Sequence, residues 1–321
     1  MISQIFPLVT TIKNHPNLKV IILMCTYNGQ RYLAEQLDSI ANQTHHNWEL
    51  WISDDGSNDQ TINIIESYQS RYAGKIYLFK GPKQGFAKNF LSLVFRADKS
   101  SDYYAYADQD DIWDLSKLER ALNQLERKPR SIPALYCSRT RLINEQGQEI
   151  GFSPLFNKPS GFRNALVQNI GGGNTMVFND AAAILIKQTK KNSFLIAHDW
   201  WTYLLVTGAG GEIIYDVYPT VNYRQHQANL IGGNKGLRAR LSRIKRMFQG
   251  HLKQWIDQNI QALLPIEAIL TEENRLILHQ FIAARNAAFM VNVFKVNRLG
   301  IYRQTMLGNL GLLVGSLFKK V

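Results

Sequence analysis

Apolar and polar positions follow one another along the first third of the chain in blocks that predict strands and helices in turn. The four short apolar blocks cover residues 19–25, 48–53, 75–79 and 103–107. Continuous runs of this length are typical of strands buried in a parallel sheet. The blocks between them place apolar residues at helical spacing over residues 31–42, 61–72 and 85–96. This alternation predicts an α/β fold, with a parallel sheet flanked by helices.

The rest of the chain predicts a less regular continuation and then a helical end. We expect a helix over 117–126, a strand over 134–142, a loop over 152–164, a helix over 180–186 and a late strand over 212–215. From Gly236 onward the pattern is helical. We therefore expect an N-terminal extension over 1–17, an α/β domain over 18–235 and a basic helical C-terminal appendage over 236–321.

A polar cluster follows each of three predicted strands. The clusters are Thr26-Tyr27-Asn28-Gly29, Asp54-Asp55-Gly56-Ser57-Asn58-Asp59 and Asp108-Gln109-Asp110-Asp111. Ligands of open α/β sheets bind at the carboxyl ends of the strands, so three polar clusters at one edge describe a nucleotide-binding crevice. The first strand is followed neither by Gly-x-Gly-x-x-Gly nor by Gly-x-x-x-x-Gly-Lys-Ser/Thr, which argues against a dinucleotide fold and a P-loop.

Asp108 and Asp110, at the tip of the fourth strand, are the candidate chemistry. Side chains at i and i+2 share a face of an extended chain, so the two carboxylates point the same way. They repel each other unless a cation lies between them. Mg²⁺ and Mn²⁺ take oxygen ligands of this kind and commonly hold substrate phosphates as well. The functional interpretation is an Asp-x-Asp metal site that holds a diphosphate, and the alternative is an acidic loop with solvated carboxylates.

Composition narrows the class of protein. The chain has 321 residues, 45% hydrophobic and 19% charged, which suits one large domain or a domain with an appendage. Cys25 and Cys137 have no paired spacing, which argues against a disulfide framework or a zinc site and favours a reduced, cytoplasmic compartment. We expect no signal peptide over 1–17 and no membrane span, because no segment reaches the ~18 apolar residues that a span needs.

The net charge of +12 suits nucleic acid, an anionic membrane surface or phosphorylated substrates as partners. Much of the excess lies after Gly236, where basic residues accompany an apolar stripe. The stripe consists of Leu237, Leu241, Ile244, Phe248, Leu252 and Trp255. A basic amphipathic helix with a Trp suits the headgroup region of an anionic membrane. A helix packed on the α/β domain with a solvated basic face explains the pattern equally well.

Taken together, the motifs resemble those of family 2 glycosyltransferases with the GT-A fold. The resemblance covers roughly residues 20–232 and rests on the order and spacing of five segments. These are Thr26-Tyr27-Asn28-Gly29, Asp54-Asp55-Gly56-Ser57, residues 85–90, Asp108-Gln109-Asp110-Asp111 and His198-Asp199-Trp200-Trp201. The segment Tyr223-Arg224-Gln225-His226, with Asn229 and Gly232, is similar to the bacterial rhamnosyltransferase-like branch.

The resemblance implies roles for individual residues. The nucleotide pocket would be lined by Thr26, Tyr27, Asn28, Asp54, Asp55, Asn89 and Asp108. Asp110, with Asp108, would hold Mg²⁺ or Mn²⁺, and His226 would be a further metal ligand near the diphosphate, together with Arg224. Asp199 would be the catalytic base, in a position where many relatives have Glu-Asp in place of His-Asp. The acceptor site would contain Gly172, Gly173, Asn174, Thr175, Trp200 and Trp201.

Most of these roles have a plainer structural alternative. His226 follows a predicted strand and suits a turn, Arg224 suits solvent, and the two Trp residues suit the core. Asp199 lies near the start of a predicted helix, where it suits a cap. The apolar surroundings of two Trp residues would raise its pKa and a helix N-terminus would lower it, and the sequence leaves the balance open.

The implied function is the transfer of a sugar from a nucleoside diphosphate to a hydroxyl, with inversion at the anomeric carbon. The first expected donor is rhamnose on thymidine diphosphate (dTDP-rhamnose), with uridine diphosphate as the other pyrimidine carrier. The acceptor would be a glycan or lipid-linked glycan in cell-surface polysaccharide synthesis. Gln-x-x-Arg-Trp, the motif of processive synthases in the family, is absent, so we expect a single addition. We expect a cytoplasmic enzyme, located peripherally on the inner face of the membrane.

Two other classes of protein stay open at this point. A nucleotidyltransferase also uses strand-end carboxylates and a metal ion, but usually has a Gly-rich loop with Lys or Arg after the first strand. A nucleic-acid-binding protein would present basic and aromatic residues on an exposed platform. Here the basic residues cluster after Gly236 and the acidic residues at the crevice, so we expect no nucleic-acid partner.

Overall fold

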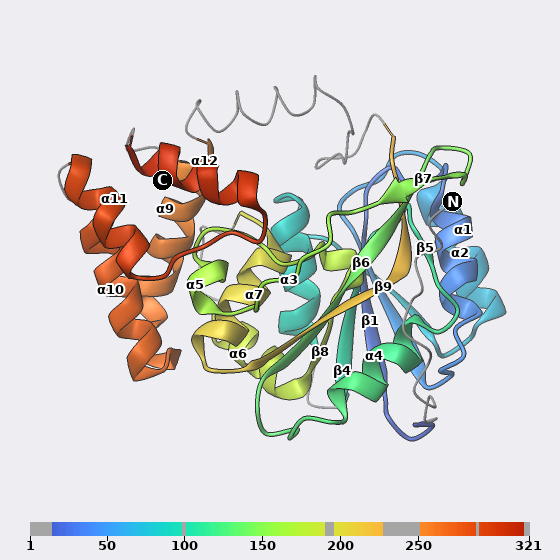
Figure 1. Cartoon of the computed structure of the whole chain (residues 1–321). Coiled ribbons are helices and arrows are strands. Elements are labelled where there is room, and N and C mark those ends of the chain that lie inside the picture. Colours follow the sequence, from blue (N-terminus) through green and yellow to red (C-terminus); the bar gives the residue numbers. More distant parts are fainter. Residues whose placement is uncertain (1–14, 98–100, 190–195, 227–250, 287–288, 318–321) are drawn as a thin grey trace.

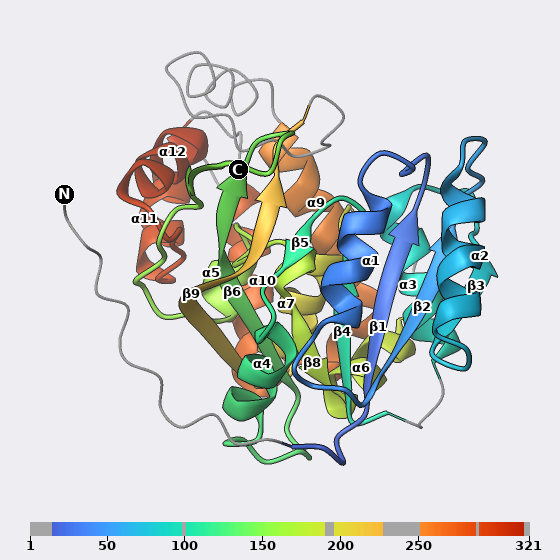
Figure 2. The same cartoon turned by 90° about the vertical axis from the view of Figure 1, so that its right-hand side faces the viewer.

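A computed structural model describes residues 15–97, 101–189, 196–226, 251–286 and 289–317. At its centre lies a sheet of nine strands with helices on both faces (Figures 1 and 2). The strand order is β3-β2-β1-β4-β8-β6-β9-β5, and β7 pairs with β6 outside this path. The expected α/β class is confirmed.

The first half of the sheet is parallel, as the sequence predicts. Its strands are β1 (Val20–Thr26), β2 (Trp48–Asp54), β3 (Ile76–Lys80) and β4 (Tyr103–Ala107). The pairs β2/β1, β1/β4 and β2/β3 are all parallel. The carboxyl ends of these strands therefore meet at one edge of the sheet, and the three polar clusters follow them there.

The second half of the sheet is mixed, which the sequence did not predict. Its strands are β5 (Ile112–Trp113), β6 (Ala134–Ile143), β7 (Glu149–Phe152), β8 (Val177–Asn179) and β9 (Glu212–Arg224). β8 runs antiparallel to β4 and β6, while β6 and β9 are parallel. β9 extends nine residues beyond the predicted strand over 212–215, because its later part pairs with β5 and with the end of β6.

Alternate residues of the central strands feed two apolar clusters on opposite faces of the sheet. Val20, Ile22 and Met24 of β1 face one cluster, and Ile21 and Leu23 face the other. The first face is covered by α1 (Leu33–Ala41), α2 (Thr61–Arg71) and α4 (Lys117–Leu125). The second is covered by α3 (Phe86–Arg96), α5 (Phe162–Ala165), α6 (Asp180–Gln188) and α7 (His198–Gly208).

The C-terminal helices pack outside α7, on the same side of the sheet as α3, α5 and α6 (Figure 1). They are α9 (His251–Leu263), the 3-10 helix η2 (Leu264–Ile269), α10 (Glu272–Asn286), α11 (Phe289–Arg298) and α12 (Met306–Leu317). Ile256 and Phe281 are buried in the same cluster as Leu204 of α7, so this region shares its core with the sheet. Within the described part of the chain, no helix has the length and apolar character needed to cross a membrane. The predicted basic helix after Gly236 lies outside the described residues as far as position 250.

Candidate active site

The loops after β1 and β2 are joined through the side chain of Asp54. Its Oδ2 accepts a hydrogen bond from the Thr26 hydroxyl at 2.8 Å, and its Oδ1 accepts the backbone N–H groups of Gly56 and Ser57. Asn28 adopts a left-handed φ of 48°, a conformation that Asn tolerates better than most residues. Its N–H donates to the Ser57 hydroxyl, and its side-chain oxygen accepts the N–H of Asn58. The two loops therefore form one preformed rim.

Gln109 connects this rim to the acidic loop after β4. Its Oε1 accepts the Tyr27 N–H at 2.9 Å, and its Nε2 donates to the Tyr27 carbonyl at 3.1 Å. A Cβ at Gly29 would collide with the Gln109 side chain, which explains the glycine at that turn. The sequence singled out Gln109 only as the spacer between two aspartates, and the structure shows that it positions the strand-end loops.

Asp110 and His226 are brought together from β4 and the end of β9. The His226 Nε2 atom lies 2.7 Å from the Asp110 Oδ2 atom. The His226 ring packs on Tyr32, with 5.3 Å between the ring centroids. Asp108 lies beside Asp110 and is partly buried. Burial, followed by the charges of Asp110 and Asp199, raises the pKa of Asp108 to about 7. Asp108, Asp110 and Asp199 therefore lie close enough for their charges to interact.

Asp111, the fourth residue of the motif, is fully buried and anchors the loop from below. It accepts hydrogen bonds from the Asn174 side-chain amide and from the Arg224 backbone N–H. Burial and the neighbouring charges of Asp110 and Asp108 raise its pKa well above the usual value. Asn174 and Thr175, which lie in the short 3-10 helix η1 (Gly173–Thr175), are themselves buried. We expected both residues at an open acceptor surface, but the structure places them beneath the acidic loop.

Lys117 places a buried amino group next to these acids. It is fully buried in α4, and its Nζ lies 3.2 Å from the centroid of the Trp113 ring. The Nζ atom has no hydrogen-bond partner within the described part of the chain. Burial lowers the pKa of Lys117 well below its usual value, while the charges of Asp111 and Asp108 act in the opposite direction. This lysine could not be singled out from the sequence, because the residues of α4 have the pattern of an ordinary amphipathic helix.

Asp199 lies in the first turn of α7 and faces η1. Its Oδ2 accepts the Gly173 N–H at 3.1 Å, and its Oδ1 accepts the Trp200 N–H at 2.7 Å. The N-cap residue of α7 is Ala197, so Asp199 is not the N-cap. Burial raises the pKa of Asp199, and the bonds from Trp200 and Gly173 only partly oppose it. The balance that the sequence left open is therefore decided by burial.

The neighbouring His198 fixes the shape of this corner. It stacks on Phe90, with 3.9 Å between the ring centroids, and is buried. Burial lowers its pKa to about 3, so the ring is neutral at ordinary pH. A Cβ at Gly173 would lie 2.5 Å from the His198 Nε2 atom. Gly173 thus allows the close approach of a side chain of this protein, whereas the resemblance implied a place for it in the acceptor site.

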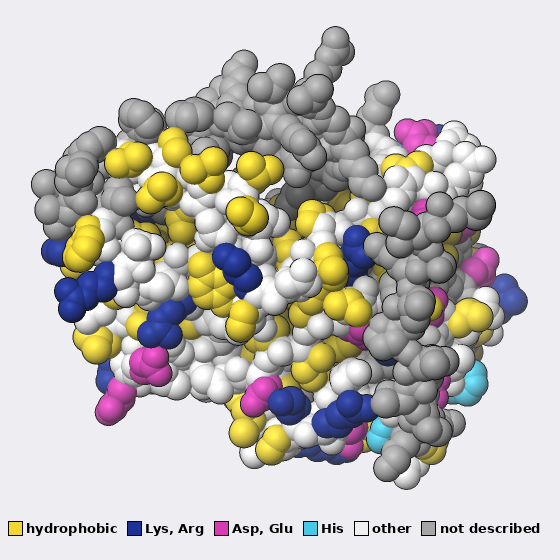
Figure 3. Space-filling model, in the orientation of Figure 1, with side chains coloured by type: hydrophobic (Ala, Val, Ile, Leu, Met, Phe, Trp, Pro, Cys, Tyr) yellow, Lys and Arg dark blue, Asp and Glu magenta, His cyan; other side chains and the backbone are white. Residues whose placement is uncertain are grey.

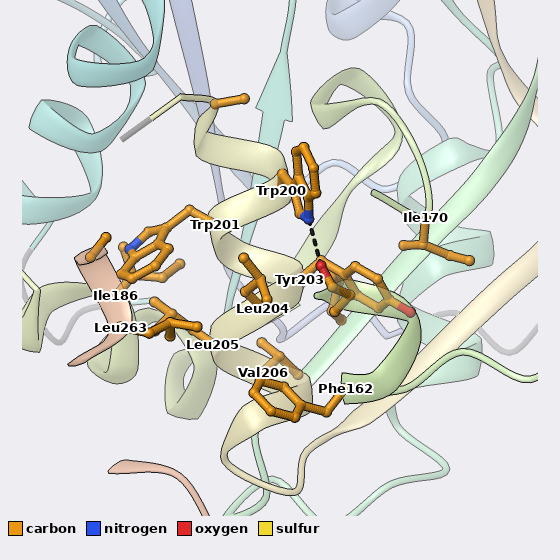
Figure 4. Packing of buried hydrophobic residues seen from close by; sticks show 14 of the residues in the cluster. Phe162, Ile170, Ile186, Trp200, Trp201, Tyr203, Leu204, Leu205, Val206 and Leu263 are labelled. Carbon is orange, nitrogen blue, oxygen red and sulfur yellow. Dashed lines mark hydrogen bonds between the residues drawn. The ribbon is translucent and has the colours of Figure 1, made fainter. Parts of the chain in front are cut away.

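Trp200 and Trp201 point to opposite sides of α7 and both lie in the core (Figure 4). The Trp200 indole N–H donates to the Ala165 carbonyl at 2.7 Å, and the Trp201 indole N–H donates to the Thr189 hydroxyl at 3.2 Å. Trp201 is fully buried, which rules it out as a surface for an acceptor sugar, and Trp200 is 6% exposed. The core alternative is therefore the one that the structure supports.

Arg224 is also buried, with 1% of its side chain exposed. Its guanidinium donates to the carbonyl oxygens of Asp110 and Glu145 and pairs with Glu35 at 2.6 Å. Neither the phosphate contact nor the solvent exposure that we considered fits this arrangement. Arg224 instead fastens the end of β9 to the acidic loop, and so places His226 beside Asp110.

The predicted nucleotide residues fall into two groups. Thr26, Asp54 and Asn89 are buried and bonded to other parts of the rim, Asn89 to the Ser53 hydroxyl and carbonyl. Tyr27 is 59% exposed and Asn28 is also exposed, so both are available to a ligand. Asp55 is partly buried, and its Oδ1 accepts the Lys83 N–H. Gly172 is the exposed member of the predicted acceptor set near Asp199.

A cavity at the other end of the sheet is separate from this site. It is lined by residues that include Ser101, Asp102, Arg130 and Asp180, at the amino end of β4. Arg130 is already paired there with Asp102 and Glu126. The chemistry described above lies at the carboxyl ends of the strands.

The sheet, its parallel half and the strand-end acids define a glycosyltransferase of the GT-A type. The family model described as glycosyl transferase family 2 matches residues 21–186, about half of the chain, and the chain belongs to this family. It is 31% identical over 235 residues to the dTDP-rhamnosyl transferase RfbG of Shigella flexneri, covering 69% of this chain and 78% of that protein.

Two further comparisons are more distant. An uncharacterized glycosyltransferase of Haemophilus influenzae is 32% identical over 108 residues, which cover 34% of this chain and 33% of that protein. The crystal structure of Staphylococcus aureus TarS in complex with UDP-GlcNAc superposes with a TM-score of 0.50 at 15% identity, covering 88% of this chain and 90% of that chain. At this identity the superposition shows a shared fold.

Proposed function

We propose that this protein is an inverting, metal-dependent glycosyltransferase that moves a sugar from a pyrimidine nucleoside diphosphate to a hydroxyl of a glycan or lipid-linked glycan. The observation that carries the proposal is the gathering of Asp108, Asp110 and Asp199 at the carboxyl edge of the sheet. Two of these carboxylates follow β4, and the third comes from α7. The two alternative classes, a nucleotidyltransferase and a nucleic-acid-binding protein, find no support in the family to which the chain belongs.

The donor side of the site is the rim formed by the loops after β1 and β2. Tyr27 and Asn28 are exposed there, and Asn28 is held in position by Ser57 and Asn58. These two residues would contact the nucleoside, while the buried Thr26, Asp54 and Asn89 would keep the rim rigid. Similarity to RfbG makes dTDP-rhamnose the first donor to test.

The carboxylates at the tip of β4 fit an Mg²⁺ or Mn²⁺ ion that is also bound by the substrate. Among the described residues, no group of three His, Cys, Asp or Glu side chains is arranged to hold a metal ion by itself. Mg²⁺ is usually bound by one or two carboxylates together with substrate phosphates, so a complete protein cage is not required. Asp110 and Asp108 would hold the ion, with His226 beside Asp110. When bound, the ion neutralises the charge that develops on the leaving diphosphate.

Asp199 would act as the base. Its carboxylate is fixed by the N–H groups of Gly173 and Trp200 and remains partly exposed. It would accept the proton of the acceptor hydroxyl while the oxygen bonds to the anomeric carbon and the bond to the diphosphate breaks. A raised pKa makes this carboxylate a stronger base than an ordinary aspartate. One displacement of this kind inverts the anomeric centre and needs no covalent intermediate.

The acceptor and the location of the enzyme are also part of the proposal. An acceptor hydroxyl would approach along Gly172 towards Asp199, because the other predicted acceptor residues are buried. A cytoplasmic enzyme attached peripherally to the inner face of the membrane would meet lipid-linked acceptors there.

The test is a screen of nucleotide sugars for hydrolysis by the purified protein with Mg²⁺ or Mn²⁺. We expect dTDP-rhamnose to be turned over in preference to purine nucleotide sugars, and turnover to stop in excess chelator. Full activity in chelator would contradict metal dependence, and preference for a guanosine diphosphate sugar would contradict the donor. Absence of turnover with every donor, in the presence and absence of sugar acceptors, would contradict the reaction itself.

A further inference from the structure

α12 presents its more apolar face to the outside of the molecule. Leu312, Gly315 and Ser316 are buried against the rest of the protein. The opposite side of the helix carries Met306, Leu307, Leu310 and Leu313, which are 87%, 73%, 56% and 45% exposed. Their spacing places them on one face of the helix. A helix that covers a core normally has the reverse arrangement, so this face calls for a partner.

The helix carries no charge of its own. Between Met306 and Leu317 there is no Asp, Glu, Lys or Arg. Its polar Asn309 is used internally, since its side chain bonds the carbonyl oxygens of Arg303 and Thr305. Figure 3 shows the hydrophobic side chains gathered over α12 at the upper side of the molecule. The face is therefore a continuous apolar surface without polar interruptions.

The chain around this face is basic. From Asn274 to the end of the sequence there is no Asp or Glu. The Lys and Arg residues in that stretch are Arg275, Arg285, Lys295, Arg298, Arg303, Lys319 and Lys320. Lys295 and Arg298 are exposed on α11, next to Phe294, which is 66% exposed. An apolar face on α12 and exposed cations on α11, Lys295 and Arg298, match the chemistry of an anionic bilayer, with phosphates outside and acyl chains within.

The position of α12 agrees with this partner. Figure 2 shows α12 at the same end of the molecule as the arrow tips of β1, β6 and β9. The carboxyl ends of the strands, where the candidate active site lies, are thus at the same end of the molecule as α12. A bilayer that covers α12 would lie beside the opening of the site.

We propose that the exposed faces of α12 and α11 dock this protein on an anionic lipid bilayer. Leu307, Leu310 and Leu313 would enter the boundary between headgroups and acyl chains, while Lys295 and Arg298 would pair with lipid phosphates. The 12 residues of α12 span ~18 Å, less than the ~30 Å of a hydrocarbon core, so the helix lies in the interface and does not cross it. A second copy of the chain is a poorer partner, because two basic surfaces would face each other.

The experiment is flotation of the full chain with vesicles of phosphatidylcholine and phosphatidylglycerol, compared with vesicles of phosphatidylcholine alone. We expect binding to the mixed vesicles, weakened by salt, and little binding to the neutral ones. The double variant Leu307→Ser/Leu310→Ser should bind the mixed vesicles at least ~10-fold more weakly, because two apolar side chains no longer enter the bilayer. Leu276→Ser is the control, since Leu276 is similarly exposed (57%) but lies on α10.

Several outcomes would overturn the proposal. Equal binding of the wild-type protein and the double variant would show that α12 is not the docking surface. A lower melting temperature of the double variant without vesicles would show that another part of this chain covers the face. Concentration-dependent dimers that the double variant abolishes would assign the face to a second copy. Turnover of the nucleotide sugar in solution, measured for both proteins, separates failure of this proposal from failure of the proposed reaction.

Discussion

The Nε2 atom of His226 lies 2.7 Å from the Oδ2 atom of Asp110, although 116 positions separate the two residues. The buried guanidinium of Arg224 maintains this pair, because it bonds the Asp110 carbonyl and Glu145. An imidazole at this distance orients the carboxylate that we propose as a metal ligand. The pair is partly buried, with 11% and 21% of the two side chains exposed, so solvent screens it only in part.

Asp110→Asn should abolish metal-dependent turnover, because an amide replaces the charged oxygen that we propose as a ligand. His226→Ala should lower kcat/KM by ~10–100-fold and raise the metal concentration needed, as expected when a partner of a metal ligand is removed. Titration of activity with Mg²⁺ and Mn²⁺ measures both effects. His279→Ala is the matched control, since His279 forms a comparable pair with Glu267 on the surface of the helical region. Wild-type metal dependence in His226→Ala would contradict the role of the pair.

Lys117 provides a test of the electrostatics beneath the site. Lys117→Met keeps a chain of similar length over Trp113 but removes the amino group near Asp111 and Asp108, and with it the positive charge of its protonated form. The acidic cluster should become more negative, so Mn²⁺ should bind at least ~10-fold more tightly. Without metal the variant should melt at a lower temperature than the wild type. Adding metal should raise the melting temperature of the variant by more than that of the wild type.

Calorimetry of Mn²⁺ binding and thermal unfolding with and without metal measure these effects. Lys253→Met serves as the control, because Lys253 pairs with Asp257 on the surface of α9 and lies outside the site. If the two variants and the wild type bind Mn²⁺ equally, the charge of Lys117 is not felt at the metal position.

The parts of this fold that the sequence revealed are those with a strong local pattern. The β1-to-β4 half could be predicted because each strand is a continuous apolar run followed by a polar turn. β5 and β8 could not, because two or three residues carry no periodicity and their pairing depends on distant strands. In the site, likewise, Asp108 and Asp110 could be predicted because their spacing is a local pattern.

The interpretation of the glycine and Trp segments shows what the sequence could not decide. Residues near a site and residues that support a site have the same composition, so Asn174, Trp201 and Arg224 could not be told from ligand-binding residues. Only burial separates them. Lys117 is the opposite case, since nothing along the chain distinguishes a buried lysine from the solvated ones on an amphipathic helix.

Gly173 tests the packing that holds Asp199. In Gly173→Ala the new Cβ would lie 2.5 Å from the His198 Nε2 atom and 3.3 Å from the Asp199 Cβ atom. The buried ring cannot move freely, because it stacks on Phe90, so we expect lower stability and lower turnover. Gly161→Ala is the control, since a Cβ there meets nothing within 4 Å. Thermal unfolding and donor turnover measure both, and wild-type behaviour of Gly173→Ala would show that this corner is adaptable.

Asp199→Asn tests the proposed base. The asparagine keeps the size of the side chain, but it has one acceptor oxygen where Asp199 uses two, Oδ2 for the Gly173 N–H and Oδ1 for the Trp200 N–H. It retains one of these bonds and cannot take up a proton from the acceptor. We expect donor affinity close to that of the wild type and a loss of at least ~10²-fold in kcat. Asp180→Asn is the control, because Asp180 also lies in the first turn of a helix, α6, outside the site.

Stability and pH separate a base from a structural carboxylate at this position. The folded-state pKa of Asp199 is raised, so the folded protein binds its proton more tightly than the unfolded chain, and ionisation costs stability as pH rises. Asp199→Asn loses one backbone hydrogen bond but does not ionise, so its stability should change less between pH 5 and pH 8 than that of the wild type. For wild-type turnover we expect the opposite trend: kcat/KM falls as pH drops through the raised pKa, because only the carboxylate accepts a proton. Calorimetry and pH–rate profiles of both proteins measure this, and an acidic limb that persists in Asp199→Asn, or near-wild-type turnover, would assign the base to another residue.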